Sequence, residues 1–210
     1  MRQILSAALC VAGMSGSIAF GGVVGERFDL FVFENNDGAP TGNIDIWVDV
    51  IDNGATVDFV WHNDSTESAN LTEIYLESSD AADLLLSPVI MNGGGVQYSS
   101  PASPGTPPGS ISLFGGAWGG SHFSADPDAP MPNVNAINPG ESLTIRFDLS
   151  GFLTYSDLIN ALNGEAGAFR LAGHVQGIGA GDASIWVVTP SPATGSLMLG
   201  GLLLTTRRRR

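Results

Sequence analysis

Two tryptophans have neighbours suited to binding sugars. Trp47 stands between Asp45 and Asp49 in an alternating segment, and Trp118 lies in a glycine-rich stretch, residues 115–120. An exposed indole beside carboxylates can stack on a sugar ring while the acids orient its hydroxyl groups. Large aromatic side chains more often contribute buried area, so packing is the simpler interpretation of both. Trp47 and Trp118 are therefore candidate carbohydrate contacts, with a packing role as the alternative.

Two oxygen-rich loops are candidates for weak calcium binding. The first contains Glu34 and Asp37, and the second contains Asp126 and Asp128. Extracellular calcium sites can be built from such loops, although neither loop matches the twelve-residue EF-hand pattern. Asparagine and aspartate also favour turns, which makes solvated turns the preferred interpretation. Calcium is the only cofactor that the sequence suggests.

The other residues capable of chemistry form no recognisable catalytic or transition-metal pattern. His62, His122 and His174 are scattered, and none has a second ligand at a zinc-site spacing. No Gly-x-Ser-x-Gly elbow follows residue 19, and nothing in the sequence pairs two of the 21 acids. We therefore expect neither an enzyme nor a transition-metal site.

Residues 1–19 predict a secretory signal peptide. Arg2 gives a positive start, an apolar stretch follows from residue 4 to residue 14, and small residues end at Ala19. The apolar stretch is too short to span a bilayer. We expect export through the Sec translocon and cleavage by signal peptidase after Ala19. The only cysteine, Cys10, would leave with the signal peptide, so disulfides and thiol chemistry are excluded from the remainder.

Residues 189–210 predict a short hydrophobic tail with a basic end. Residues 195–206 would form a helix of about 18 Å, well short of a hydrocarbon core of roughly 30 Å. Prolines on the upstream side prevent an easy extension. Arginines hold such an end on the cytoplasmic side of a membrane. These arginines are Arg207, Arg208, Arg209 and Arg210. We expect transient membrane insertion rather than a permanent anchor.

This tail resembles the PEP-CTERM sorting signal, in which a Pro-Glu-Pro motif, a short hydrophobic helix and a basic cluster are recognised and cleaved by an exosortase. Pro190, Ser191, Pro192 and Ala193 fall on the Pro-Glu-Pro-Ala positions, with Ser191 in place of glutamate. Residues 191–195 also match a Leu-Pro-x-Thr-Gly sortase motif that lacks its leucine. The three combined features favour the exosortase, and a sortase or a retained anchor is the alternative. The resemblance implies a secreted protein of the cell surface or extracellular matrix.

The stretch between the two ends is strongly acidic. It contains three arginines against all 21 acids of the chain, which is a net charge of −18 with histidine neutral. Such a charge repels phosphate backbones and excludes nucleic acid as a partner. It also favours solubility outside the cell and attracts divalent cations.

Hydrophobic periodicity between the ends predicts an all-β fold. Residues 44–50 and 56–62 alternate on either side of an Asn-Gly turn, which predicts a hairpin with Trp47 on its outer face. Residues 154–163 predict the only helix, through a Thr-x-x-Asp capping box. The remaining strand candidates are residues 28–33, 71–76, 84–90, 110–114, 142–149, 169–176 and 184–188.

Together these patterns predict an antiparallel β-sandwich of the jelly-roll or immunoglobulin-like kind over residues 20–188. Residues 138–188 also resemble an ectodomain type associated with PEP-CTERM proteins, which implies a β-sandwich of undefined activity. We expect a structural or adhesive role for this ectodomain. The alternative is a carbohydrate-binding module for an extracellular polysaccharide, and a secreted hydrolase comes third.

Overall fold

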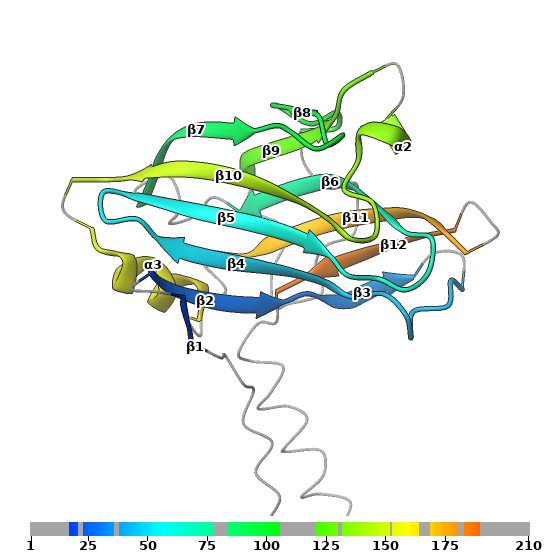
Figure 1. Cartoon of the computed structure of the whole chain (residues 1–210), viewed down its shortest axis with the longest axis horizontal. Helices are drawn as coiled ribbons and strands as arrows, with labels where there is room; N and C mark the ends of the chain where they lie inside the picture. The colour runs from blue at the N-terminus through cyan, green and yellow to red at the C-terminus, as the bar shows by residue number, and fades with distance from the viewer. Residues whose placement is uncertain are drawn as a thin grey trace, which may run out of the picture.

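The structure is a computed structural model that describes residues 17–20, 23–35, 38–77, 84–105, 121–129, 132–151, 153–163, 169–179 and 183–189. Within these residues the fold is mostly β and contains two antiparallel sheets of six strands each (Figure 1). Sheet A has the order β1 (Ser17–Phe20), β2 (Val23–Asp29), β4 (Ile46–Asp52), β5 (Thr56–Asn63), β10 (Glu141–Leu149) and β7 (Leu85–Met91). Sheet B has the order β3 (Phe31–Asn35), β12 (Ala183–Val188), β11 (Leu171–Ile178), β6 (Asn70–Glu77), β9 (Ser121–Pro127) and β8 (Tyr98–Ser99).

The hairpin formed by β4 and β5 confirms the alternation seen in the sequence. Ile46, Val48 and Val50 are buried on the inner face of sheet A, and the intervening side chains point outward. The turn needs Gly54, whose φ of 83° is strained for other residues and whose N–H donates to Asp52 at 2.8 Å. Hairpin and register follow from the alternation and this turn together.

Aromatic side chains join the two sheets across the core. Phe147 of β10 meets Phe59 of β5 edge to face with ring centroids 5.6 Å apart, and meets Phe123 of sheet B at 5.4 Å. Phe59 also meets Phe169, which immediately precedes β11, at 6.3 Å. All four rings are buried, and edge-to-face pairs add attraction beyond their buried area.

The strand predicted over residues 28–33 is divided between the two sheets. β2 ends at Asp29 in sheet A and β3 begins at Phe31 in sheet B, so Leu30 is the crossing point. The Leu30 side chain is buried in the core, and its N–H donates to the Ile46 carbonyl at 3.0 Å. The prediction of one uninterrupted strand is therefore wrong, because burial of Leu30 between the sheets turns the chain from one into the other.

The predicted helix is confirmed as α3 (Tyr155–Leu162), with the Thr154 and Asp157 capping box in place. Leu158 and Leu162 pack in the core, and the Tyr155 hydroxyl donates to the Val50 carbonyl at 2.8 Å. The helix therefore covers the end of sheet A near β4.

Four short elements were not predicted: β1, β8, β9 and the four-residue helix α2 (Pro132–Asn135). β9 contains only one large apolar side chain, Phe123, so its sequence lacks a clear alternation. Its strand conformation depends on pairing with β6. The predicted strand at residues 110–114 lies outside the described residues.

A buried ion pair fastens β6 to the chain entering β11. Arg170 donates to both carboxylate oxygens of Glu77, from Nη2 at 2.7 Å and from Nε, and both side chains are about 95 % buried. The Glu77 N–H donates to the Arg170 carbonyl at 2.9 Å. Removing one partner of such a pair leaves an unpaired charge in the interior.

We expect Arg170→Met to lower the free energy of unfolding by about 3–5 kcal/mol in a urea titration, because Glu77 would stay buried without its main counter-charge. The double variant Arg170→Met with Glu77→Met should recover much of that loss. Arg146→Met is the matched control, since its ion pair with Asp58 is more exposed and should cost less. Equal losses in the two single variants would contradict the assignment.

Candidate functional site

The outer face of sheet A carries a group of interlocking polar and aromatic side chains, here named the indole cluster. Its members are Arg27, Trp47, Asp49, His62 and Asp64. Strand register places them together, because Trp47 pairs with His62 of β5 and Asp49 pairs with Arg27 of β2. The outer-face position predicted for Trp47 is therefore confirmed.

Both ring faces of Trp47 are occupied. The His62 ring stacks on the indole with centroids 3.7 Å apart and an interplanar angle of 11°. The Arg27 guanidinium lies 4.1 Å from the ring centroid and approaches from β2, on the other side of β4. The indole N–H donates to Asp64 at 3.2 Å. A sugar could stack on this indole only by displacing one of these partners.

The cluster holds two titratable groups in an environment that disfavours their charge. Asp49 Oδ2 lies 3.6 Å from His62 Nε2. Burial raises the pKa of Asp49, opposed by the nearby Arg27, and burial lowers the pKa of His62, opposed by Asp64. Within the described part of the chain, Asp49 Oδ1 and His62 Nε2 are buried without a hydrogen-bond partner.

The outer face of sheet B carries a second line of functional groups, here named the histidine row. Across the sheet it runs Glu34, Trp186, His174 and Glu73. The His174 ring stacks on Trp186 of the neighbouring strand with centroids 4.3 Å apart and an interplanar angle of 4°. Both sheets thus place a cross-strand tryptophan–histidine stack on the outer face.

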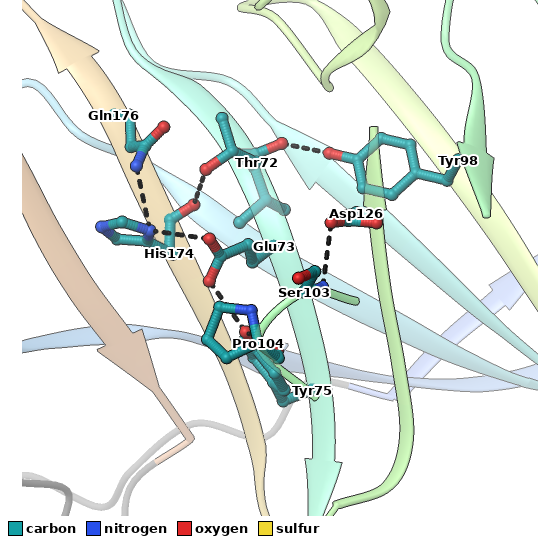
Figure 2. Close-up of polar contacts among 10 residues, drawn as sticks. Thr72, Glu73, Tyr75, Tyr98, Ser103, Pro104, Asp126, His174 and Gln176 are labelled. Atoms are coloured by element: carbon teal, nitrogen blue, oxygen red, sulfur yellow. Dashed lines mark hydrogen bonds and ion pairs between the residues drawn. The ribbon is translucent and has the colours of Figure 1, made fainter. Parts of the chain in front are cut away.

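Figure 2 shows how polar contacts continue along this row. Glu73 has one carboxylate oxygen 3.4 Å from His174 Nδ1, and its other oxygen accepts from the Tyr75 hydroxyl at 2.8 Å. The Gln176 amide nitrogen lies 3.3 Å from the same His174 nitrogen. His174 and Gln176 therefore share the outer face of β11.

The segment after β8 folds over part of this face. The Ala102 N–H donates to the Ser124 hydroxyl at 3.2 Å, and the Pro104 carbonyl accepts from Tyr75 at 2.9 Å. Ala102 and Tyr75 are buried with Trp186 in a small second core. Burial and the Glu73 hydrogen bond raise the pKa of Tyr75, so this hydroxyl stays protonated.

An imidazole beside a carboxylate is half of a general-base arrangement, which also needs a nucleophile that donates to the imidazole. Two neighbouring hydroxyl groups donate elsewhere. The single proton of the Tyr75 hydroxyl lies between two acceptors, Glu73 and the Pro104 carbonyl, and Thr72 donates to the His174 carbonyl at 3.2 Å. In these positions the imidazole and carboxylate orient each other and hold neighbouring strands together.

Of the two predicted calcium loops the structure describes Glu34, Asp126 and Asp128, and the first two lie on strands rather than in loops. Glu34 lies on β3 and Asp126 on β9, which are four strands apart in sheet B, or about 19 Å at the usual strand spacing. Asp126 accepts from the Ser103 N–H at 3.0 Å, and Asp128 joins the fold through its backbone. Within the described ranges, no three acidic, histidine or cysteine side chains are grouped to hold a metal ion.

Several predicted site residues lie outside the described residues. They are Asp37, Trp118, Pro190, Ser191, Pro192, Ala193, Arg207, Arg208, Arg209 and Arg210. Ala19, the predicted cleavage position, lies in β1, where it pairs with Val24. Neither helix in the described part of the chain has the length and hydropathy of a membrane-spanning segment.

Sequence reasoning did not predict the two tryptophan–histidine stacks. For the first, the signal was available, because the hairpin turn sets a register in which Trp47 faces His62. For the second, Trp186 and His174 meet through pairing of β11 and β12. That register includes a bulge between Val175 and Ile178, which the alternation does not indicate.

Searches against protein-family models, curated proteins and solved structures find no match for this chain.

The lowered pKa of His62 predicts a specific pH dependence. The folded-state pKa lies below the ordinary value of 6.5, so the unfolded chain binds this proton more tightly. The contribution of His62 is therefore present above pH 6.5 and is lost as the pH falls toward the folded-state pKa. We expect wild type to lose more stability than His62→Gln between pH 7.5 and 5.5 in matched urea titrations.

Ser142→Ala is the control for this comparison, because Ser142 is exposed and pairs with His62 across β10 and β5. It removes no titratable group, so its pH profile should follow wild type. Parallel profiles for wild type and His62→Gln would show that burial of His62 does not govern this pH range.

Proposed function

We propose that this chain is an exported protein of the cell surface or extracellular matrix, with a structural or adhesive role. The observation that carries the proposal is the position of the core relative to the processing signals. Among the residues whose burial the structure describes, every buried apolar one lies between Phe28 and Val188. Cleavage after Ala19 and near Pro192 would therefore leave the whole described core in the mature protein.

In this proposal the two ends act in sequence during export. The N-terminal signal leads the chain through the Sec translocon, and signal peptidase cuts after Ala19. The hydrophobic tail then pauses in the membrane, with its arginines on the cytoplasmic side. An exosortase-like enzyme recognises Pro190 to Ala193 and releases the ectodomain. A sortase acting on Thr194 and Gly195 is the alternative for this last step.

A structural or adhesive role is favoured over carbohydrate binding by the indole cluster. A stacking platform needs an open aromatic face. His62 and Arg27 occupy the two faces of Trp47, and its N–H is used by Asp64. These contacts join β2, β4 and β5, so we infer that they stabilise sheet A.

We further propose that the fold is a β-sandwich of the jelly-roll kind. Support comes from the order in which the chain visits the sheets, because it changes sheet repeatedly between β2 and β12. Such alternation between two packed sheets is found in double-sheet jelly rolls. The contact between Phe147 of sheet A and Phe123 of sheet B supports the same arrangement.

The sorting proposal is tested by the intact mass of protein recovered from the native cell surface. We expect a species that begins at Phe20 and ends near Pro192 or Ala193. Pro190→Ala should block maturation, because it removes half of the Pro-x-Pro motif. A wild-type species that keeps Arg207 to Arg210 would contradict removal of the tail.

Thr194→Ala is the matched control, since it changes the sortase motif and leaves Pro-x-Pro intact. Under the proposed exosortase pathway it should mature normally. Normal maturation of Pro190→Ala together with failure of Thr194→Ala would transfer the assignment to a sortase.

The proposed role is tested by a glycan array with the protein released from the cell surface. We expect no saturable binding that depends on Trp47, because its ring faces are occupied. Trp47→Phe keeps an aromatic ring and serves as the comparison for Trp47→Ala. Saturable binding that Trp47→Ala abolishes and Trp47→Phe retains would identify a carbohydrate-binding module instead.

A further inference from the structure

Two consecutive strands, β2 and β3, lie along one side of the two sheets, and this stretch is here named the β2–β3 margin. β2 and β3 run end to end, interrupted only at Leu30, along the lower side of the molecule in Figure 1. β3 is the edge of sheet B. β2 would be the edge of sheet A if β1 were not paired with its first residues, Val23 to Glu26.

Exposed apolar side chains gather on this margin. Val24, Phe31 and Val32 are 56, 54 and 37 % exposed, and they are among the few large apolar side chains exposed in the described chain. An edge strand with exposed apolar side chains is a template for pairing with another chain. The opposite edge of sheet A is protected, because β7 contains Pro88 and a bulge with Ser87 at a φ of 51°.

The proposed signal-peptide cleavage changes what covers this margin. β1 pairs residue by residue with β2, and Ala19 lies opposite Val24. Cleavage after Ala19 would remove Ser17, Ile18 and Ala19, which are three of the four residues of β1. The backbone groups of β2 that β1 satisfies in the whole chain would then be free. This step depends on the proposed function.

We propose that signal-peptide removal opens the β2–β3 margin to the same margin of a second copy. The two strands pair antiparallel, with Phe28 of one copy opposite Phe28 of the other. Around Phe28, β2 of one copy then lies beside β2 of the other, and beyond Leu30 β3 of each copy lies beside β2 of its partner.

Charge disfavours several neighbouring registers. Symmetric registers centred on Glu26, Arg27 or Asp29 would place each of these charges opposite its own copy. The register centred on Leu30 would place Glu26 opposite Glu34. Like charges directly opposite each other are destabilising. A register whose two-fold axis lies between two residues would place inner-face side chains of one copy opposite outer-face side chains of the other.

Centring on Phe28 instead gives favourable pairs along the strand. Arg27 faces the partner's Asp29 and Asp29 faces the partner's Arg27, which is two opposite-charge pairs on the outer face. Within one copy, Arg27 donates to Asp29 at 2.6 Å while its guanidinium lies over Trp47 of β4, so the partner's Asp29 would share a charge that already has these contacts. Val24 faces the partner's Val32, and Gly25 faces the partner's Phe31, so all three exposed apolar side chains gain a cross-strand neighbour.

Self-repulsion between two copies opposes this pairing, because each mature copy carries a net charge of −18. At physiological ionic strength the Debye length is about 8 Å, which screens most of the distant charges. The two Arg27–Asp29 pairs would lie in direct contact and are screened less. The pairing should therefore be observed near 0.15 M salt, and not at very low salt.

Cysteine cross-linking tests the register directly. The only native cysteine, Cys10, is removed with the signal peptide, so the processed chain has no thiol background. The variant Val24→Cys/Val32→Cys is expressed as the full chain and recovered after export. We expect a disulfide-linked dimer on a non-reducing gel, since facing side chains on paired strands are within disulfide reach.

Val24→Cys/Val89→Cys is the matched control, because Val89 is 53 % exposed but lies on the β7 edge. It should give no linked dimer.

Linked dimers of equal yield in both variants would overturn the register. Monomers of the test variant that begin at Phe20 would overturn the pairing and leave export intact. A chain that keeps Ser17 to Ala19 would overturn the proposed cleavage, and with it this opening.

A charge-swap series provides an independent measurement by light scattering. Asp29→Arg puts arginines opposite each other at both charge pairs, and we expect dimer affinity to fall by about tenfold or more. Arg27→Asp/Asp29→Arg restores opposite charges and should recover dimerisation. A wild-type protein that begins at Phe20 and stays monomeric at high concentration would overturn the proposal.

Discussion

Contact between the phenylalanine rings of the two inner faces is the interaction on which the fold depends. No cysteine occurs after residue 19, so no disulfide can join the sheets there. Phe147 touches Phe59 within its own sheet and Phe123 across the core, and thereby ties both layers into one apolar contact. Strand pairing holds each sheet together, and these rings, with the aliphatic side chains of the same core, hold one sheet against the other.

The outer faces use a different chemistry for the same purpose. Each carries a tryptophan stacked on a histidine of the adjacent strand, and each histidine has a carboxylate within 3.6 Å. Stacked rings cover apolar area, and on sheet B the Glu73 carboxylate and the Gln176 amide lie beside the polar edge of His174. Cross-strand pairs of this kind add to ladder hydrogen bonding and reinforce the register that the alternation specifies.

The parts of the fold that were predictable have strong local signals. The β4–β5 hairpin has clean alternation and an Asn-Gly turn, and α3 has its capping box. β9 and the crossing at Leu30 depend on partners distant in sequence, so no local pattern indicates them. The candidate site also has a predictable and an unpredictable part. The outward position of Trp47 follows from the two-residue alternation of side chains along a strand. Its coverage by Arg27 depends on pairing between β2 and β4, which no local pattern indicates.

The position of β12 has a mechanical consequence whenever the chain is pulled at its C-terminal end, as during passage through a membrane. β12 lies between β3 and β11 and is the last strand before the predicted tail. A pull applied beyond Thr189 would load β12 along its axis, against hydrogen-bond ladders on both sides at once. The load would be shared in shear by two rows of bonds, whereas an edge strand would peel away one bond at a time. Tension at the C-terminal end would therefore act on a strand that is hydrogen-bonded to a neighbour on each side.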